Sequence, residues 1–148
     1  MKTMQDLKLK IEVLQISIYS NIIKQILKRH NNLSVNKIIA FAYLIKKEKF
    51  IMYKVYTAKN TQDVVCKAIS LLAGQYTEYC ENITYILKAI HLLIEKEQIK
   101  INNNVLSVRE NIEMEKAMYE ENPFLQKAIE MSKKMTDRQF MKEVISNV

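Results

Sequence analysis

The chain contains almost no glycine and almost no proline. Gly74 and Pro123 are the only examples among its 148 residues. All-β folds need both residue types at many turns, so their scarcity argues against an all-β architecture. The glycine-rich phosphate loops of nucleotide-binding proteins are excluded as well, because each motif requires at least two glycines. The sequence therefore predicts a mostly helical protein without such a loop.

Cysteine and histidine are scarce too. The chain has Cys66, Cys80, His30 and His91, and their separations match no familiar zinc motif. Cysteine–histidine catalysis would also need an orienting group and exposed backbone amides, which a glycine-poor helical chain rarely offers. Most acidic residues stand beside lysines, as is typical of a solvated surface. We therefore expect no metal, no cofactor and no catalytic residue, and the protein is not expected to be an enzyme.

Long apolar runs are absent from the sequence. No window approaches the roughly 18 apolar residues of a membrane-spanning helix. The first residues also lack the uninterrupted apolar core of a signal peptide. Two cysteines in such a chain fit a reducing compartment. We expect a soluble, cytoplasmic protein that does not contact a membrane.

What the chain does have is positive charge, with a formal net charge of +7. The excess of Lys and Arg lies in residues 1–108, whereas residues 109–148 are nearly neutral. A basic body fits nucleic acid, an acidic protein face, or a proteome in which most proteins are basic. Arginine, the usual bidentate reader of bases, is scarce. The candidate nucleic-acid contacts are Lys24, Lys28, Arg29, Lys46, Lys47, Lys49, Lys54 and Lys100.

The clearest structural pattern runs from Asn82 to Val108. Apolar residues recur at helical spacing from Ile83 to Ile94, and then alternate with polar ones at Ile99 and Ile101. The run Asn102–Asn104 follows as a turn before Val105 and Leu106. A helix that leads directly into a hairpin is how a winged-helix domain ends. We predict a mostly α fold in which residues 1–108 form a winged-helix-like domain with one β-hairpin.

Other helices are predicted on both sides of this pattern. Residues 7–29 have helical periodicity, as one helix or as two with a break near residues 17–21. Ser34 is a candidate N-cap of a helix that continues to about Glu48. Residues 50–56 fit a strand or an irregular segment. Thr61 begins the next helix, and Gly74 marks a bend.

Residues 109–148 are predicted to form a C-terminal helical extension. Residues 111–121 are charged and helix-forming, and Asn122-Pro123 is a helix start with a capping asparagine. Thr136 opens a last helix with a capping box. The apolar faces of this extension must pack on the body or on a partner. The candidate partner-binding residues are Phe124, Leu125, Ile129, Phe140, Met141 and Ile145.

The helix before the hairpin would be the recognition helix of a DNA-binding winged helix. Its polar face carries Thr84, Lys88, His91, Glu95 and Lys96, and lacks a cluster of Arg, Asn and Gln. These side chains suit contacts with DNA phosphates, but they are poorly suited to reading bases. Winged helices also serve as protein–protein modules, and the sequence favours that role.

The order of predicted elements resembles a family of small bacterial defence proteins. These are the middle components of three-component ABC-type systems, related to the small accessory subunit of Lamassu anti-phage systems. The likeness covers roughly residues 10–108 and is carried by apolar periodicity and the change from helix to hairpin. It implies a non-catalytic subunit that connects an SMC-like ATPase to an effector, often a nuclease. The expected function is therefore an adaptor or regulatory subunit, and the alternative is a winged-helix transcriptional regulator.

Overall fold

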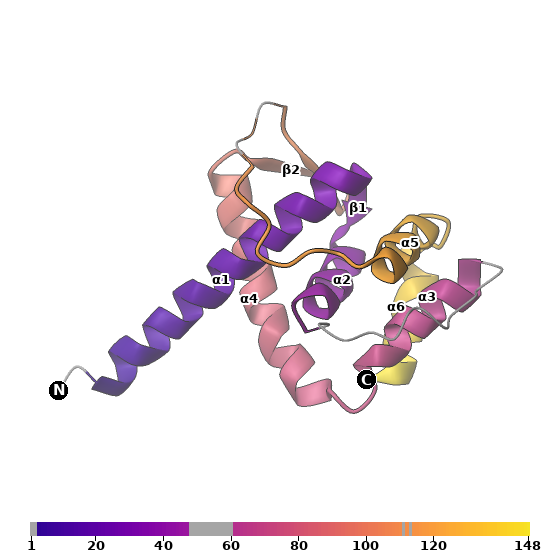
Figure 1. Ribbon diagram of the computed structural model, residues 1–148, viewed down its shortest axis with the longest axis horizontal. Helices are drawn as coiled ribbons and strands as arrows, with labels where there is room; N and C mark the ends of the chain where they lie inside the picture. The colour runs from indigo at the N-terminus through magenta and orange to yellow at the C-terminus, as the bar shows by residue number, and fades with distance from the viewer. Residues whose placement is uncertain (1–2, 48–60, 111, 113) are drawn as a thin grey trace.

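The computed structural model describes residues 3–47, 61–110, 112 and 114–148. Helices dominate this part of the chain, and three short strands form one antiparallel sheet (Figure 1). The fold is thus mostly α with one β-hairpin, as predicted. The predicted strand or irregular segment at residues 50–56 lies outside the described residues.

The first helix, α1, spans Thr3–His30 without the break that the sequence left open. Its C-terminal half is buried, whereas its N-terminal half projects from the body (Figure 1). The helix ends at Asn31, which adopts a left-handed conformation (φ 73°). Asparagine tolerates this conformation better than most residues.

The sheet has the order β1-β3-β2, with β1 at Asn32–Ser34, β2 at Ile99–Asn102 and β3 at Val105–Val108. The hairpin β2–β3 was predicted, but the strand β1 was not. Asn103 and Asn104 both have positive φ, as a two-residue hairpin turn requires. Leu33 pairs with Leu106, and both side chains are buried. The sheet therefore closes one end of the core.

The middle helices are α2 (Val35–Lys47), α3 (Thr61–Ile69) and α4 (Tyr76–Glu95). The Ser34 hydroxyl accepts the Lys37 amide proton at 3.4 Å, which confirms the predicted cap. A short 3₁₀ turn, η2 (Ser70–Leu72), precedes Gly74, whose φ of 77° makes the predicted bend. Helix α4 leads directly into β2, as a winged-helix-like arrangement requires.

The prediction of a helix over residues 111–121 is wrong for the described part of that segment. Residues 112 and 114–121 follow an irregular path across α1 (Figure 1). Asn21 donates to the Lys116 carbonyl at 3.2 Å and accepts the Met118 amide proton at 2.9 Å. These tertiary bonds satisfy backbone groups that a helix would have paired internally, so local helix propensity does not decide the structure here.

The two C-terminal helices, α5 (Pro123–Ser132) and α6 (Asp137–Asn147), pack on α2 and α3. The Asn122 cap and the Thr136 capping box form as predicted. Residues 123–148 therefore share one hydrophobic core with the body. As a result, four of the predicted partner-binding residues are interior and Met141 packs half-buried against them, while Ile145 alone is exposed. The four interior residues, which cannot reach a partner, are Phe124, Leu125, Ile129 and Phe140.

Replacing Asn122 with alanine is expected to lower the free energy of unfolding by about 1 kcal/mol. The Asn122 side chain accepts the Leu125 amide proton at 2.8 Å, and that donor would lose its partner at the start of α5. Urea denaturation followed by circular dichroism measures the change. Asn122→Ser keeps a capping oxygen and should recover most of the stability. Equal losses in both variants would contradict the capping role.

Candidate interaction surfaces

Three of the eight candidate nucleic-acid contacts interact with other residues of the chain. Lys24 is buried and its Nζ lies 3.0 Å from a Glu115 carboxylate oxygen. This hydrogen bond lowers the pKa of Glu115, although burial opposes it. Lys46 lies over the Tyr19 ring, 5.2 Å from its centroid, and Lys47 pairs with Glu78. Lys24 is therefore wrong as a nucleic-acid contact, because a buried and paired ammonium cannot reach a phosphate.

Of the other five candidates, three are exposed and two lie outside the described residues. Lys28 and Lys100 point to solvent, and Arg29 is exposed but lies 3.6 Å from Glu121. Lys49 and Lys54 fall outside the described residues. In the described part of the chain, Lys28 and Lys100 are therefore the predicted cations that are both exposed and without an ion pair.

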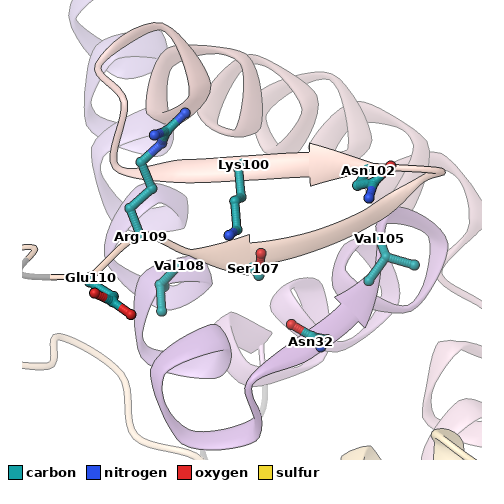
Figure 2. Close-up of a pocket in the computed structure, with 8 residues that line it drawn as sticks. All are labelled: Asn32, Lys100, Asn102, Val105, Ser107, Val108, Arg109 and Glu110. Atoms are coloured by element: carbon teal, nitrogen blue, oxygen red, sulfur yellow. The ribbon is translucent and has the colours of Figure 1, made fainter.

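Lys100 belongs to a polar hollow of about 720 Å³ on the outer face of the sheet (Figure 2). The strand register places Asn32 and Lys100 on either side of Ser107. Arg109, directly after β3, adds a second cation, and Glu110 adds an acid. Sequence analysis missed Arg109, although its place at the base of the hairpin could have indicated it. This face can contact a phosphate or an acidic group.

The exposed face of α4 does not add to this basic hollow. Lys88 pairs with Glu12 of α1, and His91 lies 3.5 Å from Glu95. Two of the larger exposed side chains are instead apolar, Leu87 and Leu92. The exposed face of α4 thus carries few side chains suited to reading bases.

A second polar hollow, of about 310 Å³, lies between α1, α2 and α4. The Tyr19 hydroxyl donates to Asn82 at 2.6 Å inside it. Burial raises the pKa of Tyr43 to about 12 and lowers the pKa of Lys46. Burial likewise raises the pKa of Tyr19. The tyrosines therefore stay neutral near pH 7, and their hydroxyls serve as hydrogen-bonding groups.

His30 joins the end of α1 to the C-terminal region. Its Nε2 lies 2.8 Å from Glu121, and its Nδ1 contacts Glu130. Burial would lower the pKa of His30, but the hydrogen bonds to both glutamates outweigh burial and raise it. Both ring nitrogens thus contact carboxylates, and the cluster ties the end of α1 to Glu121 and to α5. His91, by contrast, is exposed, as is Cys80.

A row of exposed apolar side chains lies on the projecting half of α1. Met4, Leu7, Ile11 and Leu14 recur at spacings of three and four, and each is between 46 and 67 % exposed. We call these four residues the α1 seam. Leu9 and Val13 lie on the opposite side of the helix and are also exposed. That row continues to Ile16, which lines a groove against Leu92 of α4.

Comparison with known proteins gives no identification. No protein-family model, curated protein or solved structure matches this chain. The resemblance to defence-system subunits therefore stays a prediction from sequence. In the described residues, no helix is long and apolar enough to cross a membrane.

Proposed function

We propose that this chain is a non-catalytic adaptor subunit that binds protein partners. The single observation that carries the proposal is the α1 seam, whose apolar side chains no described part of the chain covers. A contiguous apolar row in water marks an interaction site more often than an idle surface. The row sits on a helix that extends roughly 18 Å over residues 3–14, so a partner can reach it without disturbing the core.

The resemblance gives this adaptor a context. We propose that its partners are an SMC-like ATPase and an effector subunit of an anti-phage defence complex. The ATPase would hydrolyse nucleotide, and the effector, a nuclease in many such systems, would act on its target. The small subunit would bridge them. Lys24 and Lys47 form ion pairs with Glu115 and Glu78 of the same chain, which leaves them less available to a nucleic acid and so favours a protein-binding role.

The alternative function, a DNA-binding regulator, is favoured by the cations beside the hairpin. Lys100 and Arg109 share one face of the sheet and could contact phosphates. Such contacts alone would bind DNA without selecting a sequence. This alternative predicts salt-dependent binding of duplex DNA by the isolated chain.

A DNA titration separates the two functions. We expect the isolated chain to bind fluorescent duplex DNA no more tightly than about 10⁻⁴–10⁻⁶ M, the range of non-specific binding at physiological salt. The charge reversal Lys100→Glu/Arg109→Glu should weaken even that binding. Sequence-selective binding at about 10⁻⁸ M or tighter would contradict the adaptor and support the regulator.

Genomic context and co-expression test the proposed complex. Genes beside this one should encode an SMC-like ATPase and an effector. The ATPase, co-expressed with this chain, should co-purify at fixed stoichiometry. If the ATPase no longer co-purifies with the Leu7→Ser/Ile11→Ser variant, but still co-purifies with Lys100→Glu/Arg109→Glu, the result would support binding through the seam. Neighbouring genes of another kind would contradict the defence complex.

A further inference from the structure

We propose that the α1 seam docks an amphipathic helix of a partner protein that carries acidic residues beside its own apolar row. This inference rests on the proposed adaptor function and names the chemistry of the partner. The seam residues follow the alternating spacing of three and four that coiled coils use. Met4 and Ile11 take the a positions, and Leu7 and Leu14 take the d positions. A helix is therefore the element whose side chains fit between them.

Two lysines border the seam. Lys8 directly follows Leu7, and Lys10 directly precedes Ile11, so they take the e and g positions on the two sides of the apolar row. Both side chains are exposed, and neither has an ion-pair partner in the described part of the chain. Charges at e and g decide which partner a seam accepts. Glutamate or aspartate at the facing positions complements them.

A second copy of this chain fits the seam less well. The antiparallel register that matches all four apolar residues would place Lys8 against Lys8 of the other copy, and Lys10 against Lys10. Like charges at these positions disfavour pairing. Parallel pairing would bring the folded parts of both copies to the same end of the seam. The seam is also only about two heptads long, shorter than a coiled coil that is stable by itself. Charge and length both favour a different protein.

A lipid surface also fits less well. A helix that lies on a membrane concentrates its apolar residues on one face. In α1, Leu9 and Val13 lie opposite the seam, and Asp6 and Glu12 add negative charge between the two rows. The apolar residues of α1 therefore lie on two opposite sides of the helix, and a flat membrane surface could bury only one of them. A grooved protein surface can cover the seam without this requirement.

Designed peptides test the charge rule directly on the full chain. The probe is a helical peptide with leucine at a and d and glutamate at e and g, and its twin has lysine at e and g. A scrambled acidic peptide of equal composition controls for attraction to the basic chain. By fluorescence anisotropy, we expect the glutamate peptide to bind about tenfold more tightly than the lysine peptide. The variant Lys8→Glu/Lys10→Glu should reverse this preference.

A pair of matched variants locates the binding. Leu7→Ser/Ile11→Ser should abolish peptide binding, whereas Leu9→Ser/Val13→Ser on the opposite row should leave it within about twofold of the original chain. All four side chains are exposed, so both variants should keep the original unfolding midpoint. Equal loss in both variants would overturn the assignment to the seam.

Three further results would overturn the inference. The first is equal affinity for the glutamate, lysine and scrambled peptides. The second is a dimer in light scattering that Leu7→Ser/Ile11→Ser dissolves, since the occupant would then be a second copy. The third is binding to phosphatidylserine vesicles in place of the peptide. The first result removes only the charge rule and leaves the proposed adaptor function in place. The second and third would also remove the observation that carries that function. Tight, selective DNA binding by the isolated chain would contradict the adaptor function without testing the seam.

Discussion

Replacement of Phe140 by alanine should lower the free energy of unfolding by about 3–5 kcal/mol. Phe140 is fully buried, and its ring lies 5.6 Å from the Phe41 ring, measured between centroids. Truncation would remove this contact and leave a cavity between α6 and α2. The loss is large against the roughly 5–15 kcal/mol that stabilises a typical domain.

The matched control for this prediction lies on the same helix. Ile145 is 70 % exposed, so Ile145→Ala should change the free energy of unfolding by no more than about 0.5 kcal/mol. Urea denaturation followed by far-ultraviolet circular dichroism measures both variants. A Phe140→Ala protein as stable as its parent would mean that α6 does not belong to the core, and residues 123–148 would again be candidates for a partner surface.

Replacement of His30 by alanine is expected to cost about 3 kcal/mol, because it removes the hydrogen-bonded partner of the buried Glu121 carboxylate and leaves only Arg29, whose Nε lies 3.6 Å away. Glu121 is 8 % exposed and approaches His30 at 2.8 Å. A neutral imidazole carries one N–H, so contact of both ring nitrogens with carboxylates requires the protonated ring. The cluster therefore holds His30 as a cation between Glu121 and Glu130.

This cluster also predicts how stability depends on pH. The pKa of His30 is raised above its ordinary value of 6.5. The contribution of His30 to the free energy of unfolding is thus fully present below pH 6.5 and is lost as the pH rises through its raised pKa in the folded protein. Burial opposes ionisation of Glu130, but hydrogen bonds from His30 and Lys133 lower its pKa. The contribution of Glu130 to the free energy of unfolding is present above its ordinary pKa and is lost as the pH falls through its lowered pKa in the folded protein.

Urea titrations over a series of pH values test the cluster. Other charged groups at the site are Arg29, 3.6 Å from Glu121, and Lys133, 3.3 Å from Glu130. The unfolding free energy of the original chain should decline as the pH rises above 6.5, and His30→Gln should flatten that decline. The control His91→Ala removes an exposed histidine and should keep the original profile. If the unfolding free energy of His30→Gln declines with pH as steeply as that of the original chain, the decline comes from another group.

Local signals in the sequence identified most elements of the fold. Helical spacing from Ile83 to Ile94 and alternation from Ile99 onward predicted α4 and its hairpin, because these two periods follow directly from backbone geometry. The caps at Asn122 and Thr136 were equally readable, since each needs only a side chain and an amide three residues away. The same kind of spacing, from Met4 to Leu14, defines the α1 seam.

Contacts between distant residues were decided only in the tertiary structure. The strand β1 forms because β3, more than 70 residues later, offers it an edge, and three residues carry too little periodicity to predict it. Residues 114–121 stay irregular because Asn21 takes up backbone groups of Lys116 and Met118. Phe140 and Ile145 have equally apolar side chains, yet one is interior and the other exposed. The sequence by itself determined which faces are apolar, and only the packing of the whole chain decided which of them remain open to a partner, because burial depends on residues far away in the sequence.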